Sequence, residues 1–338
     1  MIIVMKRGAD DAQIGTVTKA IEDAGLKVHL SKGETQTVIG AVGNEAAVRS
    51  IPFEAMNGVE TVTPIQKPYQ LAGKELHPEP SVFDLAPGIP IGGKHIVTMS
   101  GPCSVEPGGI MMEVAKALKQ CGVQVLRGGA FKPRTSPYDF QGMGEDGLKL
   151  MAEARDETGL ALVTEVMDPR DVELVCRYVD IMQIGARNMQ NFTLLKEVGL
   201  ADKPVLLKRG LSSTYKEWFM AAEYVMSQGN RRVMLCERGI RSYDQTTRNL
   251  FDAVAVSVAK DQTHLPVVVD PSHAGGARKW VEPISKAAVA IGCDGLIIES
   301  HPEPAKALSD GAQTIALDQV PGLLKILRPI AEAVGRTI

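Results

Sequence analysis

The sequence has no run of about 20 apolar residues, the length that a membrane-spanning helix requires. Its first residues, MIIVMKRGADDAQ, have no cationic region ahead of a long apolar run, so we expect no signal peptide. Aromatic residues make up only 4% of an otherwise ordinary globular composition. The net charge is −3, so no overall basic field indicates binding to nucleic acid or to an anionic membrane surface. Any cationic site must therefore be concentrated locally.

Cysteine is also scarce. The five cysteines are widely spaced, odd in number and without a C-x-x-C pair, so we expect reduced thiols and a cytoplasmic protein. Four of them lie in or beside apolar runs and are expected to be small core residues; these are Cys121, Cys176, Cys236 and Cys293. Cys103 is the exception, because it follows the end of the strand that we predict at 95–99.

What is present is enough chain for a barrel of about 250 residues with a small appendage, since the sequence has 338 residues. Residues 1–67 predict a βαββαβ unit, with strands at 2–5, 26–30, 35–42 and 59–65. Helices are expected at 10–24 and, capped by Asn44, at 44–56. The pattern is ferredoxin-like and resembles amino-acid-sensing domains of the ACT type. The alternative is a structural or oligomerising appendage.

Residues 68–95 carry many prolines and glycines with little periodicity, which predicts a semi-rigid linker. Residues 96–338 then alternate short apolar runs with helical stretches such as 109–121, 147–158 and 215–227. The eight runs are 95–99, 123–126, 161–163, 181–184, 204–207, 233–235, 266–269 and 295–298. Apolar strands separated by helices indicate a parallel sheet that is buried on both faces. Eight of them predict an α/β fold, a (β/α)8 TIM barrel.

The segment LRGGAFKPRTSP, residues 126–137, is the most informative stretch. It places Arg127, Lys132 and Arg134 beside the hydroxyls of Thr135 and Ser136, on a loop stiffened by two prolines. Arginine binds phosphate and carboxylate groups bidentately and lysine adds a point charge, so the loop suits oxyanions. The alternative is a solvated basic loop.

Further cations follow other predicted strands. Arg187, Lys208 and Arg238 follow the fourth, fifth and sixth apolar runs within three residues, and in a TIM barrel the active site lies at these carboxyl ends. Crowded cations repel one another unless anions balance them, and Glu165 and Glu237 supply only part of that balance. The cluster favours phosphorylated substrates over a set of separate rim salt bridges.

A second group of strand-end residues has the chemistry of metal ligands. Cys103, His273 and Glu299 follow or end the first, seventh and eighth strands, and Asp310 lies in the loop after the eighth. The first and eighth strands are neighbours in a closed barrel, so three of these side chains can meet. Mixed sulfur, nitrogen and oxygen ligands suit a divalent transition metal. Each residue alone has an ordinary explanation as a core thiol, a loop histidine or a rim charge, and His301 is a weaker competing ligand.

These residues lie within motifs that resemble the type I beta subgroup of 3-deoxy-D-arabino-heptulosonate 7-phosphate (DAHP) synthases. The motifs are SGPCSVE (100–106), LRGGAFKPRTSP (126–137), QIGARN (183–188), LLKRG (206–210), CERGIR (236–241), VDPSH (269–273), ESHPEP (299–304) and ALSDG (307–311). The resemblance implies that phosphoenolpyruvate, erythrose 4-phosphate and water give DAHP and phosphate, the first step of the shikimate pathway to aromatic amino acids.

The resemblance also implies residue roles. Cys103, His273, Glu299 and Asp310 are the expected ligands of manganese, iron, cobalt or zinc. The expected phosphoenolpyruvate site consists of Arg127, Lys132, Arg187, Lys208 and Arg238. Arg134, Thr135 and Ser136 are expected to clamp the phosphate of erythrose 4-phosphate. Lys132 is expected to transfer a proton, with its pKa lowered by the arginines, and Glu237 and Glu165 are expected to assist the attacking water or to orient cations.

Two other functions fit the sequence less well than DAHP synthesis, and the N-terminal domain is expected to be regulatory. In 3-deoxy-D-manno-octulosonate 8-phosphate synthases the segment KANRSS stands where this chain has KPRTSP, so Pro133 and Thr135 argue against that activity. A non-catalytic amino-acid sensor is disfavoured by the intact set of ligands and cations. We expect an aromatic amino acid to bind the N-terminal domain near His29 and Ser31, in a homo-tetramer.

Overall fold

A computed structural model describes residues 1–33, 36–43, 45–63, 67–134 and 136–338. The expectations for Thr35, Asn44, Ile65 and Thr135 lie outside these ranges. The chain forms two compact units, Met1–Glu79 with Gln262–His264, and Pro80–Asp261 with Leu265–Ile338. The division after Glu79 falls within the segment that was expected to be a linker. No helix in the described part of the chain is both long and apolar enough to cross a membrane.

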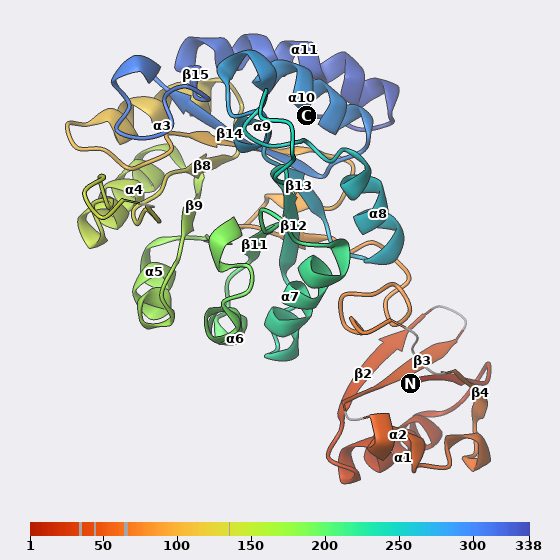
Figure 1. Ribbon diagram of the computed structural model, residues 1–338. Coiled ribbons are helices and arrows are strands. Elements are labelled where there is room, and N and C mark those ends of the chain that lie inside the picture. The colour runs from red at the N-terminus through yellow and green to blue at the C-terminus, as the bar shows by residue number, and fades with distance from the viewer. Residues whose placement is uncertain (34–35, 44, 64–66, 135) are drawn as a thin grey trace. The chain divides into compact units, whose positions relative to one another are not determined.

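The first unit is the expected βαββαβ fold. Its antiparallel sheet has the order β2-β3-β1-β4 (Figure 1). The elements are β1 (Ile2–Met5), α1 (Asp11–Asp23), β2 (Lys27–Lys32), β3 (Thr37–Val42), α2 (Glu45–Arg49), η1 (Phe53–Ala55) and β4 (Val59–Thr63). A capping box between Asp10 and Gln13 starts α1, whose buried residues Ile14, Val17 and Ile21 pack in one core with the sheet.

The second helix of this unit is shorter than the sequence predicts. We expected it to reach residue 56, but α2 ends at Arg49 and a separate 3₁₀ turn follows at Phe53–Ala55. Pro52 explains the break, because a proline disfavours helical backbone at the residue before it. The prediction was wrong in the extent of the helix and right in its place.

The second unit is a closed barrel of parallel strands. The strands follow one another around the barrel in chain order, and the pairing of β13 with β14 closes it. They are β7 (Val97–Gly101), β8 (Val125–Arg127), β9 (Ala161–Glu165), β10 (Ile181–Ile184), β11 (Val205–Lys208), β12 (Val233–Glu237), β13 (Val267–Val269) and β14 (Gly295–His301). A two-residue strand, β15 (Ile315–Ala316), pairs with the end of β14. The predicted (β/α)8 barrel is confirmed.

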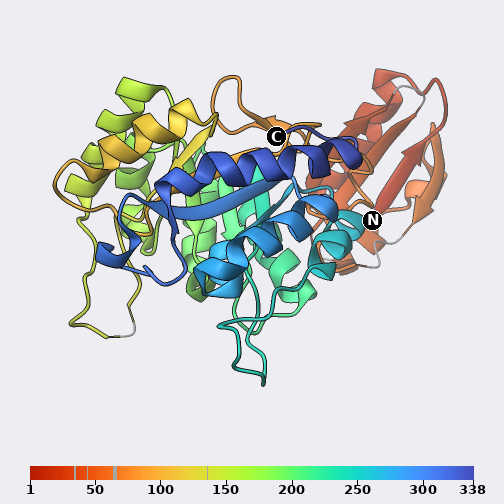
Figure 2. The same ribbon diagram turned by 90° about the horizontal axis from the view of Figure 1, so that it is seen from above.

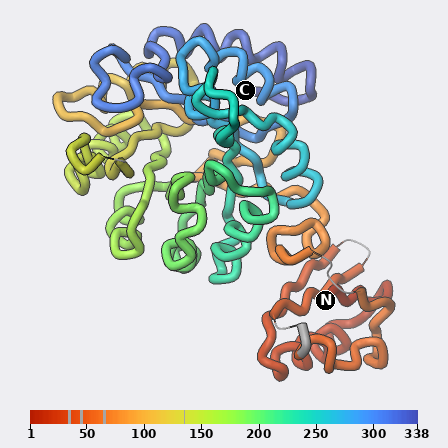
Figure 3. The backbone as a smooth tube through the Cα atoms, viewed as in Figure 1, coloured from red at the N-terminus to blue at the C-terminus, as the bar shows by residue number. Residues whose placement is uncertain are grey.

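Helices alternate with these strands around the outside of the barrel (Figures 2 and 3). They are α3 (Ile110–Gln120), α4 (Glu145–Thr158), α5 (Val172–Tyr178), α6 (Phe192–Leu200), α7 (Tyr215–Ser227), α8 (Val254–Gln262), α10 (Arg278–Ala290) and α11 (Val320–Ala333). A short additional helix, α9 (Pro271–Gly275), follows β13. Because these helices cover the outer face of the sheet, the strands are buried throughout.

Residues 80–95 close the end of the barrel where the strands begin. The strands β5 (Phe83–Asp84) and β6 (Pro90–Ile91) form a small antiparallel pair, and Leu85 and Ile91 are buried in the barrel core. Gly295, the first residue of β14, lies against Ile91. This end is therefore filled with apolar side chains, and the opposite, carboxyl end carries the polar residues.

Candidate active site

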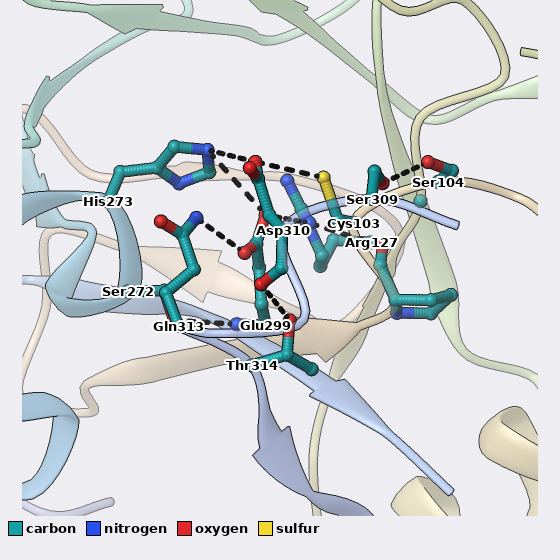
Figure 4. Close-up of polar contacts among 12 residues, drawn as sticks. Cys103, Ser104, Arg127, Ser272, His273, Glu299, Ser309, Asp310, Gln313 and Thr314 are labelled. Carbon is teal, nitrogen blue, oxygen red and sulfur yellow. Dashed lines mark hydrogen bonds and ion pairs between the residues drawn. The ribbon is translucent and has the colours of Figure 1, made fainter. Parts of the chain in front are cut away.

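Four expected metal ligands meet at the carboxyl end of the barrel. Ligand atoms of Cys103, Glu299 and Asp310 all lie within 4.8 Å of one another. The Cys103 Sγ atom is 3.4 Å from Asp310 Oδ2. His273 Nε2 lies 3.6 Å from Glu299 Oε1 and 3.7 Å from Asp310 Oδ2, so its ring faces the same point (Figure 4). The sequence prediction that these four side chains are neighbours is consistent with this geometry.

The backbone around this cluster is unusual at two positions. Gly101 has a φ of 146°, and a Cβ atom there would lie 2.1 Å from the carbonyl oxygen of Arg127, so only glycine lets β7 turn toward Cys103. Asp310 has a φ of 51° and is the one residue other than glycine with a positive φ among those described. Aspartate tolerates this left-handed conformation better than most residues. The conformation turns the Asp310 carboxylate toward the other three side chains (Figure 4).

Asp270, which the sequence analysis did not single out, orients His273. Its Oδ1 atom accepts a hydrogen bond from the His273 backbone N–H, and its Oδ2 atom lies 2.8 Å from His273 Nδ1. Lys208 Nζ donates to the same carboxylate at 2.5 Å. Burial lowers the pKa of His273, which favours the neutral imidazole with Nε2 directed at the cluster. Lys208, an expected phosphoenolpyruvate residue, is therefore paired with Asp270 in this structure.

Arg127 is also paired inside the protein. Its guanidinium donates to Glu299 Oε1 at 2.9 Å, and both side chains are at most 5% exposed. Burial opposes the charge of Arg127, but Glu299 outweighs this effect and the pKa of Arg127 is raised. Gln313 donates to the other oxygen of Glu299 at 2.6 Å. These contacts fix the orientation of the Glu299 carboxylate in the cluster.

Lys132 joins the metal cluster to the neighbouring cavity. Its Nζ atom lies 3.0 Å from both the Sγ atom and the carbonyl oxygen of Cys103. Burial raises the pKa of Cys103 to about 11, with a further increase from Glu299 and an opposing effect of Lys132. We expected the arginines to lower the pKa of Lys132, and this was wrong. Burial and Arg127 do lower it, but Cys103, Glu165 and Glu299 prevail and raise it.

A cavity of about 240 Å³ adjoins this cluster. Four of the expected substrate cations line it, together with one arginine that the sequence analysis missed. The cations are Lys132, Arg134, Arg187, Arg238 and Arg248, and Asp139, Glu165, His273 and Asp310 lie on the same wall. We call this space the substrate cavity. It has the charge required to hold phosphorylated anions next to the metal ligands.

Two buried polar atoms near the substrate cavity, Arg134 Nη2 and Glu165 Oε1, have neither a hydrogen-bond nor an ion-pair partner among the described residues, whereas His273 Nδ1 lacks a hydrogen bond but lies 2.8 Å from Asp270 Oδ2. A buried polar group without a hydrogen bond is costly, so both atoms indicate a place for a ligand or water. Arg134 is held by a bond from its Nε to the Phe140 carbonyl oxygen at 2.9 Å. Ser136 is half-buried on the same loop but does not line the cavity.

Glu237 does not line the substrate cavity. It is fully buried, with Oε2 accepting from Arg209 at 3.1 Å and Oε1 accepting from the Gly239 N–H at 2.6 Å. Burial raises its pKa, and Arg209 opposes this increase. Both oxygens are therefore already engaged, which disfavours the expected role of Glu237 in activating water. Glu165 is the expected carboxylate that does face the cavity.

The residues expected to form a regulatory site lie in the N-terminal unit. His29 and Ser31 are half-buried on β2, which is an edge strand of the four-stranded sheet. The neighbouring Lys32 forms an exposed ion pair with Asp11 at 3.1 Å. The described residues thus place all three side chains on one strand at the edge of the sheet.

Comparison with known proteins matches both units. Residues 72–335 match the DAHP synthetase I family, and residues 1–67 match the DAHP synthase ferredoxin-like domain. The phospho-2-dehydro-3-deoxyheptonate aldolase of Thermotoga maritima is 48% identical over 335 residues, covering 99% of each chain. A crystal structure of the Thermotoga maritima enzyme, also titled DAHP synthase, covers 99% of this chain with a TM-score of 0.79 and 47% identity.

Two other relatives are informative. A truncated form of 3-deoxy-D-arabino-heptulosonate 7-phosphate synthase from Thermotoga maritima covers 80% of this chain and 98% of its own, with a TM-score of 0.74 and 45% identity. The 2-dehydro-3-deoxyphosphooctonate aldolase of Methylococcus capsulatus is only 31% identical, over 75% of this chain and 94% of its own. The matches to both units and the identity along nearly the whole length show that the chain belongs to the DAHP synthetase I family.

Proposed function

We propose that the chain is a DAHP synthase, which condenses phosphoenolpyruvate with erythrose 4-phosphate and water to give DAHP and phosphate. The observation that carries this proposal is that the cluster of expected metal ligands and the substrate cavity share residues. Lys132 touches Cys103 and lines the cavity, and His273 and Asp310 belong to both. A metal held by the cluster therefore lies beside bound phosphorylated substrates.

The residues of the cluster fit a divalent transition metal. Thiolate, imidazole and carboxylate ligands bind manganese, iron, cobalt or zinc, and proteins of this family are generally metal-dependent. Cys103, His273, Glu299 and Asp310 would hold the ion, which would supply a Lewis acid for the aldehyde oxygen of erythrose 4-phosphate. Coordination also deprotonates a thiol, which offsets the raised pKa of Cys103.

The chain's own residues bind and orient the two substrates. Arg187, Arg238 and Lys132 would hold phosphoenolpyruvate. Arg127 and Lys208 would support this site through their ion pairs with Glu299 and Asp270. Arg134 would hold the phosphate of erythrose 4-phosphate, with Thr135 and Ser136. Because Lys132 stays protonated, it is suited to donate a proton to the oxygen that becomes an alkoxide. Fixed cations also screen the repulsion between the two anionic substrates.

A coupled assay of phosphoenolpyruvate consumption tests the proposal directly. We expect kcat/KM to be far higher with erythrose 4-phosphate than with arabinose 5-phosphate. The relatives named 2-dehydro-3-deoxyphosphooctonate aldolase are more distant in sequence than the Thermotoga maritima enzyme. A preference for arabinose 5-phosphate would instead support 3-deoxy-D-manno-octulosonate 8-phosphate synthesis. If phosphoenolpyruvate is consumed with neither aldose phosphate, the result would support a non-catalytic sensor.

The two substrate positions are separable by mutation. We expect Arg134→Ala to raise the KM for erythrose 4-phosphate about 10- to 140-fold, because a charge-assisted hydrogen bond contributes about 1.5–3 kcal/mol. The KM for phosphoenolpyruvate should change much less. Arg187→Ala should show the opposite pattern, since Arg187 follows β10 whereas Arg134 lies on the loop after β8.

Arg328→Ala is the matched control for this pair, because Arg328 is an exposed arginine on α11. Initial rates are measured with each substrate varied while the other is saturating. Similar KM changes for both substrates in both variants would contradict the assignment of the two positions.

We also propose that the N-terminal unit senses an aromatic amino acid, tyrosine or phenylalanine, near His29 and Ser31. Such a ligand can inhibit only to the extent that it binds an inhibited state of the enzyme more tightly than the active state. Association of this domain with copies of itself, as in a homo-tetramer, is part of the same proposal. The free thiols of the five cysteines are consistent with a cytoplasmic location.

Deleting residues 1–67 should leave an active enzyme that no longer responds to either amino acid. The cut preserves two contacts that tie the following segment to residues 262–264, from Tyr69 Oη to Gln262 at 2.5 Å and from His264 to the Leu71 carbonyl oxygen at 2.7 Å. Rates of the full-length and shortened proteins are compared with millimolar tyrosine, phenylalanine or tryptophan. If the full-length enzyme ignores all three, the domain is structural.

A further inference from the structure

A second cavity at the carboxyl end of the barrel is lined by four arginines. Its volume is about 210 Å³, and its walls also include Ala186, Leu211 and Asn249. The arginines are Arg187, Arg238, Arg241 and Arg248. We call it the arginine cavity. Three of the four arginines also line the substrate cavity, so the two spaces meet at these side chains.

The charges of the arginine cavity are not balanced by its walls. Among the described residues no carboxylate lines it, whereas three carboxylates line the substrate cavity. Arg238 is only 4% exposed, and within the described part of the chain its side chain makes one hydrogen bond, a long contact of 3.4 Å to the adjacent Gly239 carbonyl oxygen. The side chains of Arg187 and Arg241 form no hydrogen bond or ion pair within the described chain. Guanidinium groups gathered in this way repel one another until an anion joins them.

The outer pair, Arg241 and Arg248, is held by a hairpin that follows β12. Ile240 and Leu250 exchange two backbone hydrogen bonds, of 3.0 and 2.8 Å, and thereby fix the base of the hairpin. The Arg241 N–H also donates to the Leu211 carbonyl oxygen at 2.7 Å. The backbone is thus anchored on two elements, while both arginine side chains remain exposed.

The two outer arginines differ in their contacts. Arg248 donates to Gln313 at 2.7 Å and lies 3.6 Å from Asp310 Oδ1. It therefore also supports the loop after β14 that carries the metal ligand Asp310. Arg241 has no such contact. Substitution of Arg241 therefore changes the charge of the arginine cavity without breaking a side-chain hydrogen bond or ion pair among the described residues.

We propose that Arg241 and Arg248 form an outer phosphate position, through which inorganic phosphate leaves after the reaction. The inference rests on the proposed function, because DAHP synthesis releases one phosphate from phosphoenolpyruvate. A phosphate held by Arg187 and Arg238 is already in contact with residues of both cavities. When this phosphate moves toward Arg241, it passes from the substrate cavity to the arginine cavity. Guanidinium groups can bind the phosphate bidentately at each stage of this movement.

The test uses Arg241→Gln in the full-length, metal-loaded enzyme, with Arg328→Gln as a control for the loss of one exposed arginine. Titration calorimetry with inorganic phosphate should show binding at least about tenfold weaker in Arg241→Gln and unchanged in the control. Product inhibition by phosphate should weaken by the same factor. The KM for phosphoenolpyruvate should change less than about twofold. Arg241→Lys, which keeps the charge but not the bidentate fork, should be intermediate.

Unchanged phosphate affinity in Arg241→Gln would overturn the proposal. An equal increase of the phosphate dissociation constant and the KM for phosphoenolpyruvate would also overturn it, because the substrate's phosphate group would then occupy this position. A wild-type chain that binds phosphate but turns over no substrate would contradict the proposed function, and the calorimetric comparison of the variants would still decide the phosphate position.

Discussion

Cys103→Ala is expected to abolish activity and remove the metal while leaving the barrel folded. The thiol is only 3% exposed, yet its neighbours are Lys132, Glu299 and Asp310 rather than the apolar side chains of a core. Loss of a Lewis acid removes several kcal/mol of transition-state stabilisation, which corresponds to a decrease in kcat of about 10³-fold or more.

Cys293→Ala is the matched control. This cysteine is fully buried outside the cluster, and burial raises the pKa of its thiol to about 12. Its substitution should reduce stability modestly and leave kcat and metal content unchanged. Elemental analysis, thermal unfolding and initial rates of both variants separate a ligand from a core thiol.

Treatment with a chelator extends this prediction to the unmodified enzyme. Activity should disappear when the metal is removed and return to differing degrees with manganese, iron, cobalt or zinc. Full activity in excess chelator, with no metal detected by elemental analysis, would contradict the assignment of the cluster.

The metal cluster was predictable because strand order in a barrel is cyclic. β14 pairs with β7, so residues at the ends of the first and last strands, Glu299 and Cys103, are neighbours although 196 positions separate them in the sequence. The apolar runs located every strand. They placed the ends of β10 and β13 correctly but those of the other six strands too early, because residues such as Arg127, Glu165, Lys208 and Glu299 lie within strands whose polar ends form the barrel mouth.

The pairing of charges at this mouth could not be predicted in the same way. A list of strand ends shows which cations and carboxylates share a rim, but pairing depends on side-chain direction and separations of a few ångströms. Arg127 forms an ion pair with Glu299, and Lys208 forms one with Asp270. The motifs contain all four residues but do not show which of them pair. Arg248 carried no sequence signal, because it lies within an irregular hairpin, between Ile240 and Leu250, whose return to the barrel mouth has no periodic pattern.

Asp270→Ala is expected to have the largest effect on stability. The carboxylate is 1% exposed and lies between Lys208 Nζ at 2.5 Å and His273 Nδ1 at 2.8 Å. Burial alone raises the pKa of Asp270, but His273 and Lys208 hold it well below its usual value, so the group is ionised. Its removal leaves the buried Lys208 charge without a partner, which costs about 3–5 kcal/mol. It also releases His273, so metal affinity should fall about 10- to 100-fold.

Asp294→Ala distinguishes these two effects. Asp294 is also buried, and it forms ion pairs with Lys260 at 2.9 Å and Arg336 at 3.0 Å, away from the metal cluster. Both variants should lower the free energy of unfolding of the metal-free protein, but only Asp270→Ala should weaken metal binding. Wild-type metal affinity in Asp270→Ala would show that His273 does not depend on this carboxylate.

The double variant Lys208→Met/Asp270→Ala identifies the source of the lost stability. If the cost of Asp270→Ala comes from the stranded lysine charge, removal of that charge should restore most of the free energy of unfolding, measured in urea without metal. Metal affinity should remain low in the double variant, because His273 still lacks its carboxylate partner. Recovery of metal affinity together with stability would mean that the single substitution acted through general loosening of the barrel mouth, and not through the orientation of His273.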